Sequence, residues 1–157
     1  LLPLLHQRVA SYPNALAEGG VNFWDAFRVI PVSDHFWHDG VRLEVFPVRH
    51  HWPDTAFGVR LHGSLVWTGD TRPIPEMLAK FADADELIAH DCALEGNPSH
   101  SGIDDLEREY PRALLARCLL YHYASAEDGE ALRARGHRVA APGERVPLRT
   151  PAGMGPG

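Results

Sequence analysis

Hydrophobic and polar residues follow a regular pattern from residue 41 onward, and this pattern predicts alternating strands and helices. Apolar and polar side chains alternate over 41–48, as in a strand with one buried face. Shorter apolar runs bounded by turn residues predict strands at 56–61, 64–68, 86–89, 117–123, 137–141 and 145–148. Helical spacing predicts helices at 75–84, 103–115 and 125–135. The resulting order, β-β-β-α-β-α-β-α-β-β, predicts an α/β sheet with helices packed against it.

Particular residues mark where the predicted helices begin and end. Pro111 ends or kinks the second helix, because proline has no N–H for the helical hydrogen bond. Ser125, followed three residues later by Asp128, resembles a capping box that opens the third helix, and Gly136 provides its stop. The acidic run at 104–109 predicts a solvated helix face whose charges are favoured near the helix N-terminus.

The composition fits one soluble globular domain. With 157 residues, 45% hydrophobic and 23% charged, the chain is not a disordered, coiled-coil or collagen-like polymer. No apolar run exceeds about five residues, whereas a membrane span needs about 20, so we expect no membrane segment. The net charge of −6 argues against a broad phosphate-binding surface but allows a local pocket for an anionic substrate. Cys92 and Cys118 form no CxxC pair and no secretion leader is visible, so we expect a reducing, cytoplasmic location.

Histidine and aspartate residues stand at the ends of four predicted strands. They are His50 and His51 after 41–48, Asp70 after 64–68, His90 and Asp91 after 86–89, and His122 at the end of 117–123. Ligand sites of α/β sheets lie beyond the carboxyl ends of the strands, so we expect these side chains to meet. Imidazole and carboxylate together suit zinc, manganese or iron. Asp70, on a Gly-Asp turn after an apolar strand, is the candidate for bridging two metal ions.

Five segments resemble, in order, the second half of a known family. They are 46–50 (FPVRH), 68–73 (TGDTRP), 88–91 (IAHD), 99–101 (SHS) and 119–123 (LLYHY). The family is that of the metallo-β-lactamase-fold hydrolases, in the branch that contains ribonuclease Z and phosphodiesterases. The resemblance implies part of a four-layer αββα sandwich, mainly its C-terminal half. It implies a connecting region over 1–40, the C-terminal half of the domain over 41–150, and a flexible tail over 151–157.

The resemblance also implies a role for each site residue. His50 matches a ligand of one metal ion, Asp70 the aspartate that bridges both ions, and His122 a ligand of the second ion. His100 matches a histidine that contacts the scissile phosphate or protonates the leaving group, and Asp91 matches a position that often carries glutamate. An imidazole held by a carboxylate can act as a general acid, which fits Asp91 and His100 as a pair. Asp70, Asp91 and His100 are therefore the expected catalytic residues, with a metal-bridging hydroxide as nucleophile. We expect two divalent ions, zinc first with manganese or iron as alternatives, and a small nucleotide or RNA phosphodiester as substrate.

The chain departs from the family at the main ligand motif, H-x-H-x-D-H, which is absent from its 157 residues. The closest string, at 33–39, has the wrong spacing and precedes a predicted strand instead of following one. In the family this motif lies in the first half of the domain. The chain therefore resembles the C-terminal portion of a longer enzyme.

Several alternatives stay open at the level of the sequence. His51 is the alternative metal ligand to His50, Asp70 also suits a turn cap, and Asp91 and His100 also suit structural roles. The same site is suited to a thioester, a sulfate ester or a lactone. A non-catalytic binding module that keeps half a metal site is a further alternative. The oligomeric state is open, with a homodimer among the alternatives.

Overall fold

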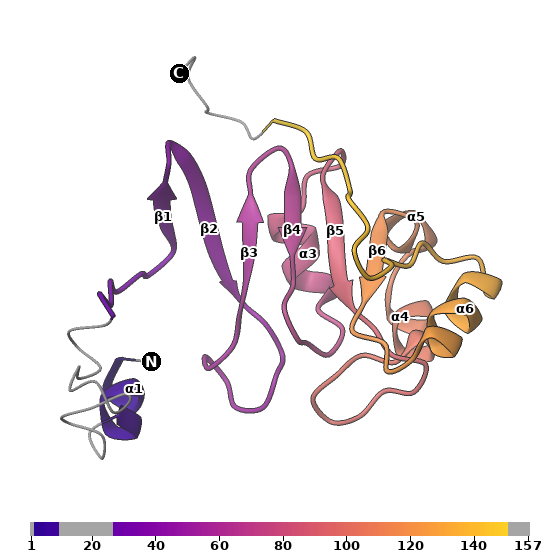
Figure 1. The fold of residues 1–157 in the computed structure, drawn as a ribbon, viewed down its shortest axis with the longest axis horizontal. Helices are drawn as coiled ribbons and strands as arrows, with labels where there is room; N and C mark the ends of the chain where they lie inside the picture. Colours follow the sequence, from indigo (N-terminus) through magenta and orange to yellow (C-terminus); the bar gives the residue numbers. More distant parts are fainter. Residues whose placement is uncertain (1, 10–26, 151–157) are drawn as a thin grey trace. The chain divides into compact units, whose positions relative to one another are not determined.

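The computed structural model of the protein describes residues 2–9 and 27–150, and the chain divides into two compact units between residues 33 and 34. In the first unit, Leu2–Val9 form helix α1. The second unit contains a six-stranded sheet in the order β1-β2-β3-β4-β5-β6 (Figure 1). Its strands are β1 (His35–His38), β2 (Val41–Pro47), β3 (Phe57–Leu61), β4 (Leu65–Trp67), β5 (Leu87–Asp91) and β6 (Cys118–Tyr121). Its helices are α3 (Pro75–Phe81), α4 (Ile103–Glu109), α5 (Arg112–Leu115) and α6 (Ala126–Ala134).

The strand directions place the carboxyl ends of β2, β4, β5 and β6 at one edge of the sheet. The strands from β1 to β4 pair antiparallel, so β2 and β4 run in the same direction. The strands β4, β5 and β6 pair parallel. The α/β class predicted from the sequence is confirmed, and the sheet is mixed.

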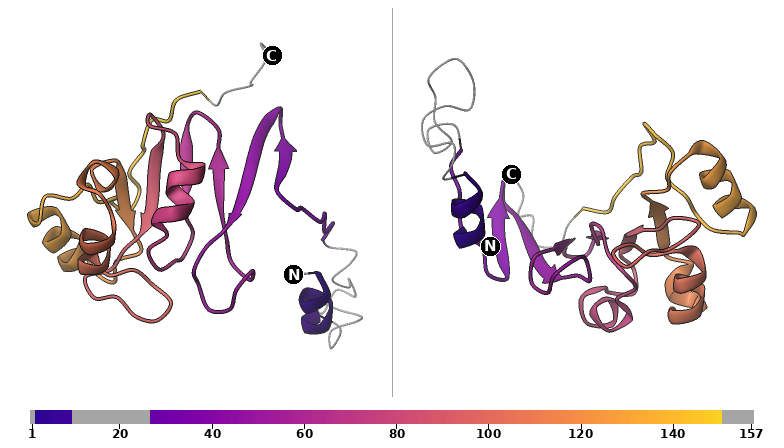
Figure 2. Two further views of the ribbon diagram at one scale, coloured as in Figure 1. Left: turned by 180° about the vertical axis from the view of Figure 1, so that it is seen from behind. Right: turned by 90° about the horizontal axis from the view of Figure 1, so that it is seen from below.

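One face of the sheet is buried beneath helices. Phe46, Val66 and Ile88 are fully buried and share a hydrophobic core with Ile74 and Leu78, which lie at helix α3. Seen from behind in Figure 2, α3 lies across this face. The core therefore holds β2, β4 and β5, and with them the loops that follow these strands.

The opposite face is also apolar but is partly exposed. Trp67 and Phe57 are 47% and 37% exposed, and their neighbours Val66 and Gly58 are buried, so the two aromatic side chains point away from the core. Val59 lies beside Trp67 in the register of β3 and β4. A sheet face in contact with water usually carries polar residues, so this apolar face is suited to packing against another layer.

The predicted strands at 137–141 and 145–148 are wrong. Val139 makes only an isolated bridge to β6, and the backbone around it belongs to no strand. Pro142 and Pro147 have no N–H to donate to a neighbouring strand, which prevents regular pairing there.

At the other end of the sheet, β1 is an unpredicted strand. Its sequence, HFWH, shows no alternation of apolar and polar residues, and it is formed by pairing with β2 from His35 opposite Glu44 to His38 opposite Val41. The strand lies within 1–40, whose role as a connecting region stays a prediction. The predicted tail at 151–157 lies outside the described residues.

The predicted helix boundaries at Pro111, Ser125 and Gly136 are confirmed, whereas α3 ends at Phe81 instead of at the predicted residue 84. Helix α4 ends and α5 begins on either side of Pro111. The Asp128 N–H donates to the hydroxyl oxygen of Ser125 at 3.1 Å and so caps α6. Gly136, with φ of 89°, follows the end of this helix. Among the described helices, none is long and apolar enough to cross a membrane.

Candidate metal centre

Four side chains from three loops and a strand end meet at the shared edge of the sheet. Asp70 follows β4, Asp91 ends β5, His122 follows β6, and His100 lies in the loop between β5 and α4. Each offers a ligand atom, and these atoms all lie within 4.8 Å of one another. The parallel strands β4, β5 and β6 therefore bring together residues more than fifty positions apart. Of the strand-end residues expected to meet, Asp70, Asp91 and His122 lie in this group.

Asp91 lies at the centre of this group. Its Oδ2 accepts hydrogen bonds from the Thr71 N–H at 2.8 Å and from Nδ1 of His100 at 2.9 Å. The Asp91 side chain is fully buried, and burial raises its carboxyl pKa even though Thr71 and His100 favour the charged form. Among the described residues, Oδ1 of Asp91 has no hydrogen-bond partner. A buried carboxylate oxygen without a partner indicates a place for a cation.

His122 connects Asp70 with Asp91. Its Nε2 lies 3.7 Å from Oδ1 of Asp70, and its Nδ1 lies 3.3 Å from Oδ1 of Asp91, a contact without hydrogen-bond geometry. His122 has φ of 74°, which is unfavourable for a residue with a Cβ. Strained backbone of this kind persists where the surroundings impose it, often at functional sites. Two oxygens and an imidazole at these separations suit a divalent metal ion.

His50 lies beside the group but not within it. Its ring centre is 4.8 Å from that of His100, and the ring of His100 in turn stacks on that of His122 at 4.8 Å. Nδ1 of His50 lies 3.0 Å from the Ser99 carbonyl oxygen and donates to it, which leaves Nε2 available to a metal ion. The backbone next to His50 is fixed, since the Arg49 N–H donates to the Thr71 hydroxyl at 3.1 Å.

The neighbouring histidines have different surroundings. His51, the alternative ligand, has φ of 54° and places Nδ1 3.0 Å from the Ser99 hydroxyl. His90, which had no assigned role, is fully buried with Nε2 2.6 Å from the Tyr110 hydroxyl, and burial lowers its pKa to about 4. His90 is therefore a neutral, structural residue, because its ring faces the core instead of the sheet edge. The choice of His50 over His51 stays a prediction.

Comparisons with known proteins identify the family of this chain. The sequence model of the family described as "Anti-Pycsar protein Apyc1" matches residues 5–144. The chain belongs to the Apyc1 family. This Apyc1-family chain is 32% identical to ribonuclease Z of Picrophilus torridus over 84 residues. The alignment covers 46% of this chain and 25% of that protein.

A solved structure shares the fold. It is titled "Crystal Structure of a New Diphosphatase from the PhnP Family", and 68% of this chain superposes on 43% of it with a TM-score of 0.54 and 17% identity. The chain thus spans a quarter of the ribonuclease Z and less than half of the diphosphatase. The resemblance to the metallo-β-lactamase fold and to ribonuclease Z is confirmed.

The sequence interpretation missed the residues that support the candidate site. Thr71 contacts both Asp91 and Arg49, and Arg72 contacts Asp105 at 2.6 Å. The prediction of a solvated acidic face is wrong at Asp105, whose side chain is only 16% exposed because Arg72 and Arg108 cover it. The sequence feature that could have indicated their role is the position of Thr71 and Arg72 directly after Asp70, within a segment that resembles the family.

Proposed function

We propose that this chain provides one half of a metal-dependent phosphodiesterase site that hydrolyses a cyclic nucleotide. The observation that supports it most directly is the group of Asp70, Asp91, His100 and His122 within 4.8 Å, with a partnerless carboxylate oxygen at its centre. The family match favours a cyclic nucleotide over other small nucleotides and over RNA. The net charge of −6 and the single lysine, Lys80, also favour a small substrate, since a long RNA needs a basic surface.

The residues present fit divalent metal ions. Of the expected ligands, Asp70 and His122 lie within the group of four and His50 lies beside it, and these three would hold the ions. We expect two such ions, and zinc is the first candidate. When bound, they would supply positive charge at the phosphate and lower the pKa of the attacking water. Asp70 occupies the exposed side of the group, 42% accessible, where substrate and solvent reach it. His50 keeps one ring nitrogen engaged at Ser99, which orients the other.

His100 is the residue that donates a proton to the leaving group. Its Nδ1 is bound to Asp91 Oδ2 at 2.9 Å, so Nε2 is the nitrogen that faces the substrate. In hydrolysis, the water oxygen forms the new P–O bond and loses a proton to solvent. The bond from phosphorus to one ribose oxygen breaks, its electron pair goes to that oxygen, and Nε2 of His100 supplies the proton. Asp91 holds the imidazole in the required orientation.

A second layer completes the proposed architecture. The described part of the chain offers three expected metal ligands, and a two-metal site needs more. We propose that an H-x-H-x-D-H segment, from the same polypeptide or another chain, packs on the apolar face that contains Phe57 and Trp67, giving the four-layer αββα sandwich. Phosphodiesterase activity is thus a property of the assembled domain.

The experiment is a substrate panel on the full-length, metal-loaded protein. It includes a cyclic mononucleotide, bis(p-nitrophenyl) phosphate, a thioester, a sulfate ester and a lactone. We expect the phosphodiesters to be hydrolysed fastest, and Asp70→Asn to lower kcat/KM by about 100-fold or more. Asp85→Asn, at an exposed carboxylate 57% accessible, is the matched control and should leave the rate unchanged. Preference for the thioester or lactone would overturn the phosphodiester assignment, and no hydrolysis at all would favour a binding module.

A further inference from the structure

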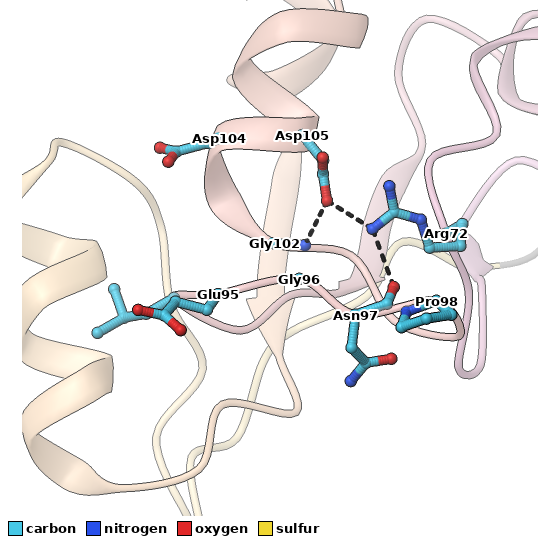
Figure 3. Close-up of a pocket in the computed structure, with 9 residues that line it drawn as sticks. Arg72, Glu95, Gly96, Asn97, Pro98, Gly102, Asp104 and Asp105 are labelled. Carbon is cyan, nitrogen blue, oxygen red and sulfur yellow. Dashed lines mark hydrogen bonds and ion pairs between the residues drawn. The ribbon is translucent and has the colours of Figure 1, made fainter.

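The loop that holds His100 crosses between two cavities. One, of about 480 Å³, is lined by Arg72, Gly96 and Asp105 among others and is drawn in Figure 3. The other, of about 330 Å³, lies on the side of His50 and Trp52. Arg72 and Pro98 line both. Open space therefore borders part of this loop on both sides, and hydrogen bonds contribute to its position.

Arg72 supplies two of the loop's hydrogen bonds from a single nitrogen. Others come from within the loop, where Asn97 Oδ1 accepts from the Ser99 and His100 N–H groups, and from the Ser101 hydroxyl, which donates to the Thr71 carbonyl. Nη1 of Arg72 donates to the Asn97 carbonyl at 3.1 Å, to the His100 carbonyl at 3.0 Å and to Oδ2 of Asp105 at 2.6 Å. Figure 3 shows Arg72 between Asp105 on one side and Asn97 on the other. With two hydrogens for three acceptors, one hydrogen is shared, and Asp105 fixes the guanidinium for the two carbonyls.

Asp105 is in turn fixed to the far end of the loop. Its Oδ2 accepts from the Gly102 N–H at 3.2 Å, and its Oδ1 accepts from Arg108 at 2.7 Å on the solvent side. Space around this point is closed, since a Cβ on Gly96 would lie 2.4 Å from Oδ2 of Asp105 and 2.9 Å from Nη1 of Arg72. Gly96 and Gly102, at the two ends of the loop, therefore pack closely against the Arg72–Asp105 pair.

We infer that Arg72, held by Asp105, is the positioning residue that places His100 for proton transfer to the leaving group. This inference rests on the proposed phosphodiesterase function and specifies how the site achieves it. Arg72 lies two residues after Asp70, and its backbone N–H donates to the Arg49 carbonyl at 2.8 Å. The segment that contributes Asp70 thus also fixes the backbone of Arg49, next to His50, and the backbone of His100. The same segment therefore positions both the expected metal ligands and the proton donor.

The test compares Arg72→Met with Arg108→Met in the full-length, metal-loaded protein. Both variants remove a guanidinium that contacts Asp105, but Arg108 is 61% exposed and contacts only the solvent side. Two substrates separate the roles, because p-nitrophenolate departs without a proton whereas a ribose oxygen needs one. We expect Arg72→Met to lower kcat for the cyclic nucleotide by about 30- to 100-fold and kcat for bis(p-nitrophenyl) phosphate by less than about threefold. Arg108→Met should change either value by less than about twofold.

A second measurement needs no activity. Amide hydrogen exchange at 97–101 should become faster in Arg72→Met and stay unchanged in Arg108→Met. Arg72→Lys retains the charge, but the lysine side chain is shorter by about one bond. Its kcat values and its exchange rates at 97–101 should therefore lie between those of Arg72→Met and the wild type. Equal loss on both substrates, or unchanged exchange at 97–101, would overturn the inference while leaving the phosphodiesterase proposal intact. A wild-type protein inactive on both substrates would instead contradict the proposed function.

Discussion

Glu86→Ala is expected to destabilise the protein without altering the metal centre. Glu86 precedes β5, at the end opposite Asp91, and its side chain is fully buried. Its carboxylate accepts from Nε of Arg60 at 3.0 and 3.1 Å, from the Gly63 N–H at 2.6 Å and from the Asp83 N–H at 2.9 Å. Truncation removes all of these contacts and leaves Arg60, only 8% exposed, without its main partner. The buried charge of Arg60 then keeps only its contacts with Asp83 and Glu44.

The size of the effect follows from what Arg60 retains. Burial acts to lower the pKa of Arg60, but Glu86, Asp83 and Glu44 together raise it above its ordinary value, so the guanidinium stays charged. Breaking a buried pair costs about 3–5 kcal/mol, and the remaining contacts with Asp83 and Glu44 place the cost of Glu86→Ala at about 3 kcal/mol. Urea denaturation measures it, with Asp85→Ala, an exposed neighbour, as a control expected within about 0.5 kcal/mol of wild type.

A double variant tests the physical reason. Arg60→Met with Glu86→Leu removes both charges and restores apolar contacts of similar volume. We expect the double variant to be more stable than Glu86→Ala, because neither charge is then buried alone. If Glu86→Ala costs less than about 1 kcal/mol, or if the double variant is the less stable of the two, the charge-burial argument is refuted.

Three further outcomes are expected. Gly58→Ala should cost about 1–3 kcal/mol in denaturation, since its Cβ would lie 2.4 Å from the Phe46 ring; a neutral result would mean that the ring moves freely. Arg72 lowers the pKa of Asp105 to about 2, so the unfolding free energy should lose up to about 2 kcal/mol as pH falls from 4 through 2, and Asp105→Asn should remove that dependence. After dialysis, elemental analysis of the 157-residue chain should find less than about one metal ion per chain, and Asp70→Asn should reduce it; two tightly held ions would show that the ligand assignment is incomplete.

The site was more predictable than the edges of the fold. Asp70, Asp91 and His122 each follow or end an apolar strand, and parallel strands bring their carboxyl ends together whatever the intervening sequence. Short-range patterns were therefore sufficient to place them. β1 shows no such pattern, and its pairing with β2 could not be derived from HFWH alone.

Long-range polar contacts were not predictable from the sequence. Asp105 shares the spacing of a solvated helix face with its acidic neighbours, and only Arg72, thirty-three residues earlier, distinguishes it. His90 and Asp91 are adjacent, yet one side chain faces the core and the other the sheet edge. The alternation of a strand separates them, but which of the two faces the site depends on the register of β5 with β6.

The proposed second layer gives the apolar sheet face and the three expected ligands a common physical explanation. Trp67 precedes Asp70 by three residues, so the surface that needs covering and the site that needs ligands adjoin at the end of β4. A layer packed on Phe57 and Trp67 removes apolar surface from water and, if it holds imidazoles and carboxylates at its own edge, supplies them next to Asp70 and His122. Because metal binding then adds to the free energy of packing, each process strengthens the other. Phe57 or Trp67 replaced by a charged residue should therefore weaken metal binding without touching a ligand.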